Sequence, residues 1–246
     1  MNVPIGAFFP ILYSILFFYL TIVFFISYKR SNDQISGYMS PMSLFIGFSF
    51  FLFGVPPILF PTESLSLTLT TNVMGYFVSY IAIAFYAMTL SPLLLPKVKP
   101  MYFFLVAFLL GTGISILDVL TLIPTTITDK GLIVRHIPSF VLLLNNTLLG
   151  LIFIPFSGSF IYQSIKKGLV AKGMFFGVGA ALLSLFLPLS LQAQEVNTYF
   201  FFSIGATLGG MFIMLAVTVW GSQTIHISPI EKTNQTSQPN QPDRTP

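Results

Sequence analysis

Long apolar runs alternate with short polar gaps along this chain of 246 residues. Each run has about 19 to 27 residues, which at about 1.5 Å per helical residue is enough to cross a hydrocarbon core of about 30 Å. Only helices and closed barrels satisfy their backbone in lipid, and continuous runs of this length indicate helices. The pattern therefore predicts an all-α, polytopic integral membrane protein, a seven-transmembrane-helix bundle with spans at about 5–28, 41–60, 72–94, 101–123, 138–164, 173–191 and 199–220.

The gaps between the spans are too short to hold a further domain, so residues 1–220 are expected to form one transmembrane domain. Residues 221–246 are rich in Gln, Asn, Thr and Pro and have little to bury, which predicts a disordered polar cytoplasmic tail. A cleavable signal peptide carries basic residues before its apolar run. Here Lys29 and Arg30 follow the first run instead, which indicates a first span inserted with its N-terminus outside.

Basic residues concentrate in alternate gaps and in the tail. Only Lys130 and Arg135 occupy the opposite set of gaps. An excess of Lys and Arg in short loops marks the cytoplasmic side, so we expect the N-terminus outside, the C-terminus inside and a location in the cell membrane. The cytoplasmic set is Lys29, Arg30, Lys97, Lys99, Lys166, Lys167, Lys172, Lys232 and Arg244.

Composition narrows the classes of partner. Hydrophobic residues make up 54% of the chain and charged residues 7%, whereas a soluble domain has roughly 25% charged residues. The net charge of +4 suits loops that face anionic headgroups of the lipid bilayer. Because no block of like charge exceeds two residues, we expect no nucleic-acid partner. The chain has no cysteine, which excludes disulfides and thiolate chemistry.

Spans 1–3 and 5–7 would run in the same directions, with the fourth span as an inverting linker. This possible 3+1+3 parallel repeat resembles the architecture of the SWEET and PQ-loop carriers of sugars and amino acids, with Pro10, Pro56, Pro155 and Pro188 in equivalent spans. No span contains the Pro-Gln dipeptide of those families, so the resemblance covers architecture only. The topology is also similar to the seven-span sensory regions of some prokaryotic histidine kinases, although no motif supports that likeness.

Asp118 is the only formally charged residue well inside a span. An ionisable group in hydrocarbon is costly and is a functional hypothesis by default. It shares one helical face with Gly111 and Ser115, which predicts that it points into the bundle. It could bind a proton or a cation, or it could form a structural ion pair with Lys130, Arg135 or His136 in the following loop. The ion pair is the favoured interpretation.

Two further groups of polar residues lie within spans. Asn145 and Asn146 occupy the fifth span, where Asn146 and Ser157 belong to a small, polar stripe. Tyr76 in the third span shares a side with other polar residues. Either group could line a solute pathway, but hydrogen bonding between helices is the favoured explanation. Small-xxx-small patterns, Gly173-xxx-Gly177 and Gly205-xxx-Gly209, predict close packing of spans 6 and 7.

No constellation for catalysis is evident. No histidine lies within a span, which excludes an HExxH zinc site and bis-histidine haem in the membrane, so we expect no cofactor and no metal site. We therefore expect a non-enzymatic sensor, receptor-like protein or accessory membrane subunit that acts through a membrane or cytoplasmic protein partner. A small-solute transporter with a polar midplane site is the alternative, supported by the prolines, Asn146 and Asp118. A membrane enzyme acting on lipid is the second alternative.

Overall fold

A computed structural model describes residues 5–59, 65–121, 126–128, 131–134, 136–167 and 170–218. Within these ranges, seven helices are long and apolar enough to cross a membrane, which confirms the all-α fold class and the number of spans. They are α1 (Ile5–Ser31), α2 (Gln34–Leu59), α3 (Leu65–Met88), α5 (Pro100–Leu120), α6 (Ser139–Lys167), α7 (Val170–Gln192) and α8 (Val196–Thr218). The short helix α4 (Leu90–Leu94) continues the third span after a break at Thr89.

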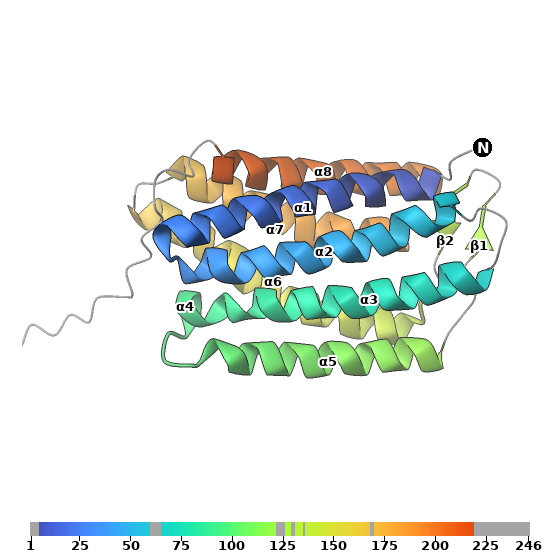
Figure 1. Cartoon of the computed structure of the whole chain (residues 1–246), viewed down its shortest axis with the longest axis horizontal. Coiled ribbons are helices and arrows are strands. Elements are labelled where there is room, and N and C mark those ends of the chain that lie inside the picture. The colour runs from blue at the N-terminus through green and yellow to red at the C-terminus, as the bar shows by residue number, and fades with distance from the viewer. Residues whose placement is uncertain are drawn as a thin grey trace, which may run out of the picture.

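The helices form a ring in chain order (Figure 1). Helix α1 packs along α2, α2 along α3 and α3 along α5, while α6 packs along α7 and α7 along α8. The ring closes where α5 meets α6 and where α8 meets α1, and both of these seams are more sparsely packed than the other pairs. The ring thus consists of two well-packed groups, and the 3+1+3 parallel repeat stays a prediction.

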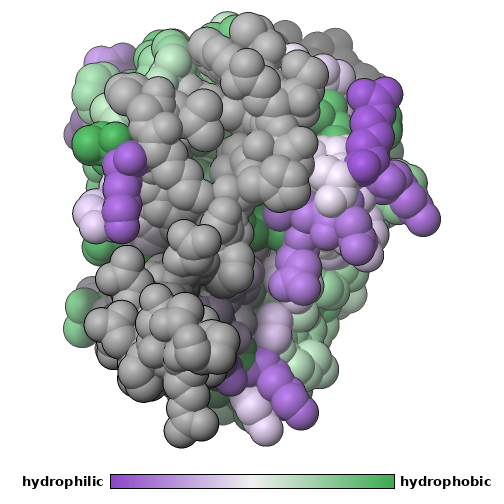
Figure 2. All heavy atoms as spheres, turned by 90° about the vertical axis from the view of Figure 1, so that its left-hand side faces the viewer, coloured by the Kyte–Doolittle hydropathy of each residue, from purple (hydrophilic) through white to green (hydrophobic). Residues whose placement is uncertain are grey.

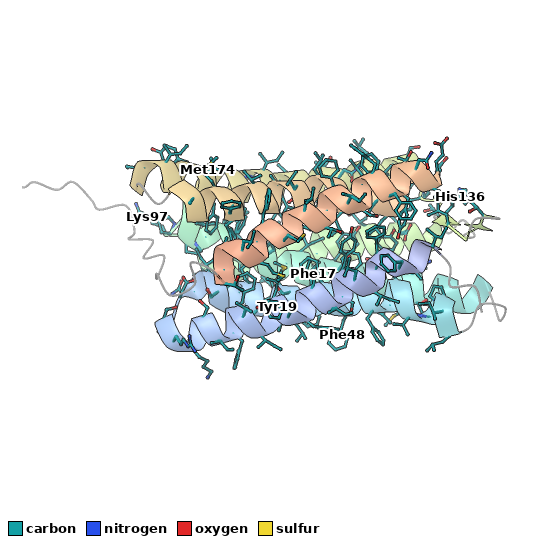
Figure 3. All side chains as sticks on the ribbon, turned by 90° about the horizontal axis from the view of Figure 1, so that it is seen from above. Phe17, Tyr19, Phe48, Lys97, His136 and Met174 are labelled. Atoms are coloured by element: carbon teal, nitrogen blue, oxygen red, sulfur yellow. The ribbon has the colours of Figure 1, made fainter. Side chains whose placement is uncertain are left out.

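The two ends of the bundle differ in chemistry. The end reached by the last turns of α1 and α6 and the first turn of α5 carries exposed Lys29, Arg30, Lys97, Lys99 and Lys166, and we call it the basic end. Hydrophilic side chains gather around this end, which faces the viewer in Figure 2, with apolar side chains beside them. Lys97 and His136 lie at opposite ends of the bundle (Figure 3).

A two-stranded hairpin occupies the other end, which we call the hairpin end. Strand β1 (Thr126–Ile127) pairs antiparallel with β2 (Ile133–Val134) in the stretch predicted to be an outer loop. The Gly6 N–H of the first turn of α1 donates to the Gly131 carbonyl at 3.1 Å. The hairpin therefore satisfies one of the backbone donors that every helix leaves unpaired at its N-terminus.

The turn between α1 and α2 is much tighter than the polar stretch after Lys29-Arg30 suggests. Only Asn32 and Asp33 separate the two helices, and Asn32 has a φ of 52°, a left-handed conformation that Asn tolerates well. The Asp33 carboxylate accepts hydrogen bonds from the Ser36 N–H at 3.0 Å and the Ser36 hydroxyl at 2.7 Å. Because Asp33 caps the helix in this way, α2 begins at Gln34, several residues before the apolar span predicted from residue 41.

Large apolar side chains cover the outside of the ring. Leu109, Ile154 and Leu208, all in the middle of helices, are among those exposed. An apolar surface of this extent is unstable in water but matches the hydrocarbon of a bilayer. Together with the seven apolar helices, this surface is compatible with a multi-pass membrane protein.

Candidate functional site

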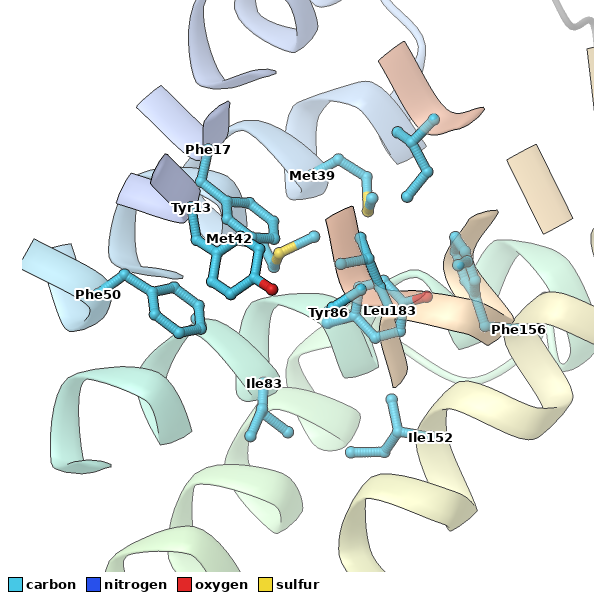
Figure 4. Close-up of a cluster of buried hydrophobic side chains, with 14 of the residues drawn as sticks. Tyr13, Phe17, Met39, Met42, Phe50, Ile83, Tyr86, Ile152, Phe156 and Leu183 are labelled. Carbon is cyan, nitrogen blue, oxygen red and sulfur yellow. The ribbon is translucent and has the colours of Figure 1, made fainter. Parts of the chain in front are cut away.

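A cavity of about 120 Å³ lies inside the ring, between helices α1, α2 and α3 on one side and α6, α7 and α8 on the other. Its wall is mostly apolar and aromatic, with Phe17, Phe50, Phe53, Phe153 and Leu183 among the lining residues. In Figure 4, Phe17, Met42 and Phe50 from α1 and α2 face Tyr86 and Leu183 from α3 and α7 across the bundle interior. Because six helices contribute to the wall, its shape depends on how the two helix groups sit together.

The cavity extends along the bundle rather than across it. Phe24 and Met39 line it toward the basic end, whereas Ile137 and Gln192 line it near the hairpin end. Aromatic contacts fix much of the wall: the rings of Phe17 and Phe50 stack at 6.1 Å between centroids, and Phe53 meets the Tyr76 ring edge-on at 5.1 Å. Such pairs resist rearrangement, so this part of the wall is preformed.

Three serine hydroxyl groups on the wall are bound to nearby backbone. Ser49 donates to the Gly75 carbonyl at 2.7 Å, and Ser79 and Ser184 each donate to a carbonyl of the preceding helical turn. Ser43 and Tyr86 differ, because neither hydroxyl oxygen has a hydrogen-bond partner among the described residues. Both side chains are buried, at 0% and 2% exposure, and both line the cavity.

A break in the third span fixes the backbone beside Tyr86. Thr89, which follows the last residue of α3, donates its N–H at 3.0 Å and its hydroxyl at 2.5 Å to the Tyr86 carbonyl. The helix resumes at Leu90, and the Thr89 side chain is fully buried. Thr89 therefore fixes the Tyr86 carbonyl through both its N–H and its hydroxyl group.

Asn145 links the cavity wall to a polar junction of three helices. The Tyr80 hydroxyl of α3 donates to Asn145 Oδ1 of α6 at 2.9 Å. Tyr80 also packs on Gly111 of α5, where an added Cβ would lie 2.6 Å from the Tyr80 Cβ. Asp118 of α5 interacts electrostatically with Tyr80. Tyr80 therefore contacts both helices that meet at one sparse seam of the ring.

The structure brings together only some of the residues singled out from the sequence. Tyr76 and Asn145 line the cavity. Asn146 is exposed and does not line the cavity, and it accepts a long hydrogen bond, 3.5 Å, from Gln192 of α7. Ser157 is buried but does not line the cavity, and its hydroxyl has no partner within the described residues. Asp118 is partly exposed on α5, which contributes nothing to the wall.

The ion pair expected for Asp118 is not found within the described residues. Of its three expected partners, Lys130 and Arg135 lie outside those residues, whereas His136 is described and exposed. The described part of the chain also holds no group of three or more His, Asp or Glu side chains placed to bind a metal ion.

Sequence reasoning did not identify Ser43, Tyr86 or the two methionines Met39 and Met42 as site residues. Each is an ordinary residue type for a membrane helix, and no spacing distinguishes it from its neighbours. They come together only because α2 and α3 both border the centre of the ring.

A comparison of the chain with protein-family models, curated proteins and solved structures found no match.

Proposed function

We propose that this protein is a receptor-like membrane protein that binds a small, largely apolar molecule inside its helical bundle. The observation that carries the proposal is the central cavity and its aromatic wall. Buried pockets lined by apolar side chains with a few polar groups are the usual form of small-molecule sites. The proposal keeps the protein in the sensor or accessory-subunit class that its sequence favours.

The size of the cavity limits the ligand. An engineered apolar cavity of roughly 150 Å³ in another protein stays dry and binds benzene. At about 120 Å³, the cavity here suits a single ring or a short branched chain. A larger amphiphile would fit only with one end inside and the rest between helices.

Ligand binding has a direct route to a change in shape. A molecule in the cavity touches both α1–α3 and α6–α8, while these groups meet each other along sparse seams. Such a ligand binds more tightly to the arrangement whose walls fit it, and it shifts the population toward that arrangement. A membrane or cytoplasmic partner protein that contacts the basic end would respond to this change by binding one arrangement more tightly. The positive-inside rule proposes that the basic end faces the cytoplasm.

The two alternative functions receive less support. A transporter of polar solutes needs a polar midplane site, yet Asn146 and Ser157 lie off the wall and most of the wall is apolar. An enzyme acting on lipid needs acid and base groups that converge. Asp118, the acidic residue singled out within a span, lies on α5 and does not line the cavity.

A binding experiment tests the proposal directly. The protein in lipid nanodiscs is titrated with 3-fluorotoluene and followed by ¹⁹F NMR, with unlabelled toluene as competitor. A bound resonance that saturates and is displaced by the competitor separates site binding from partitioning into lipid.

Two adjacent alanines on α7 offer a matched pair of variants. Ala180 lines the cavity and is 4% exposed, whereas Ala181 is exposed on the outside. Ala180→Met places three more heavy atoms of a flexible side chain at the wall and should abolish the bound resonance. Ala181→Met adds the same atoms outside and should leave it intact. If neither variant changes the signal, or if the wild type gives no saturable signal, the proposed function is wrong.

A further inference from the structure

Two buried side chains that line the cavity carry hydroxyl groups without a hydrogen-bond partner among the described residues. Ser43 on α2 and Tyr86 on α3 are 0% and 2% exposed, and no described residue hydrogen-bonds to either hydroxyl oxygen. Native proteins pair nearly all buried polar groups, so each exception calls for an explanation. Ser43 and Tyr86 line the same cavity, so a polar group of a bound ligand would explain both.

The Tyr86 ring cannot easily turn its hydroxyl toward another acceptor. It lies 4.4 Å from the Phe153 ring and 4.4 Å from the Phe156 ring of α6, measured between centroids. Thr89 holds its backbone through two hydrogen bonds to its carbonyl. The hydroxyl is therefore presented in a fixed position, as expected of a group that orients a ligand.

The other serine hydroxyl groups of the wall do not compete for this role. Ser49 is committed to the Gly75 carbonyl, and Ser79 and Ser184 are committed to their own helices. The remaining lining side chains near Ser43, such as Met39, Met42 and Ile46, are apolar. The cavity thus combines a mostly apolar wall with the uncommitted hydroxyl groups of Ser43 and Tyr86.

We propose that the ligand is a compact apolar molecule with one hydroxyl group, a phenol or a small alcohol, whose hydroxyl hydrogen-bonds to Tyr86 and Ser43. This inference rests on the proposed function, because it names the chemical class of the molecule in the same cavity. A hydroxyl both donates and accepts, so it can pair with Tyr86 and Ser43 in either direction.

The test compares two probes of nearly equal shape, 3-fluorophenol and 3-fluorotoluene, in the nanodisc ¹⁹F NMR experiment. The quantity measured is the ratio of their affinities in wild type and variant, which cancels the different partitioning of the two probes into lipid. One hydrogen bond to an otherwise unpaired buried hydroxyl corresponds to about a fivefold to tenfold change in affinity. Tyr86→Phe should therefore lower the phenol-to-toluene affinity ratio about fivefold to tenfold, and Ser43→Ala should lower it in the same direction.

Tyr162→Phe is the matched control, because Tyr162 lies on the outside of α6 with 65% exposure. It removes the same oxygen away from the cavity and should leave the ratio unchanged. Binding of 3-fluorotoluene reports whether the cavity of each variant is still formed. If Tyr86→Phe binds neither probe, its cavity has collapsed, and the affinity ratio of Ser43→Ala then tests the proposal.

The outcomes separate the two proposals. If neither probe binds to the wild-type protein, the proposed function fails. If both probes bind and the ratio is the same in wild type, Tyr86→Phe and Ser43→Ala, the cavity accepts apolar molecules but its hydroxyl groups do not select them. That result overturns this inference and leaves the proposed function standing.

Discussion

Replacing Gly179 of α7 by alanine should force α7 and α8 apart. A Cβ at Gly179 would lie 2.7 Å from the Gly209 carbonyl oxygen and 3.0 Å from the Ile213 backbone nitrogen. The approach is reciprocal, since a Cβ at Gly209 would lie 2.8 Å from the Gly179 carbonyl oxygen. The atoms in the way belong to the backbone, so no side-chain rotation can relieve the clash.

The distances set the size of the effect. Ordinary contacts of a Cβ begin near 3.4 Å, so the two helices must separate by about 0.7 Å at this point. Overpacking of a well-packed interface costs roughly 1–3 kcal/mol. Alanine recovers up to about 1 kcal/mol through its better helix propensity. With that recovery in full, we expect Gly179→Ala to lower the free energy of unfolding by up to about 2 kcal/mol, and by about 1–3 kcal/mol relative to an alanine at an unobstructed helical glycine.

Reversible unfolding in mixed micelles, followed by far-UV circular dichroism as the mole fraction of SDS rises, measures this difference. Gly113 on α5 and Gly158 on α6 supply the controls, because an added Cβ at either position meets nothing within 4 Å. Gly113→Ala and Gly158→Ala should be neutral or up to about 1 kcal/mol more stable. Equal stability of Gly179→Ala and Gly113→Ala would refute the close backbone approach of α7 and α8.

The same unfolding assay checks two further substitutions. The buried Tyr13 hydroxyl of α1 donates to the Ser203 carbonyl of α8 at 2.7 Å across a sparse seam. Tyr13→Phe should therefore lower the free energy of unfolding by about 0.5–1.5 kcal/mol. Tyr19→Phe, on the exposed face of α1, should leave it unchanged. Asp118→Asn should stabilise the protein by about 1 kcal/mol at pH 7, because it removes an intramembrane carboxyl that lacks an ion pair within the described residues. A loss of stability would instead indicate an ion pair with Lys130 or Arg135.

The glycine patterns show what the sequence could predict about packing. Small-xxx-small spacing predicted close packing of the sixth and seventh spans, and α7 and α8 do pack closely at Gly179 and Gly209. The prediction was less accurate about partners: added Cβ atoms at Gly173 and Gly177 would meet residues of α6, and one at Gly210 would meet Leu16 of α1. Spacing reveals a face that permits close approach, but the partner on that face depends on the order of helices in the ring.

The site was harder to predict than the fold, and α6 shows why. The polar stripe through Asn146 and Ser157 suggested one face of this helix, whereas the cavity is lined by Asn145, Leu149 and Phe153. Neighbouring residues on a helix point about 100° apart. An error of one residue therefore replaces a residue that lines the cavity by one that does not. Periodicity could not correct the error, because both faces of α6 are largely apolar: one meets lipid and the other meets an aromatic interior.

Tyr80 connects the polar face of α5 to the cavity wall. Gly111 and Ser115 share that face, and Asp118 adds an ionisable group to it, yet α5 contributes no residue to the wall. Its influence passes through Tyr80, which packs on Gly111, interacts electrostatically with Asp118 and donates to Asn145 on the wall. A change at Asp118 can therefore alter ligand binding by moving Tyr80 and Asn145, at the sparse seam of α5 and α6.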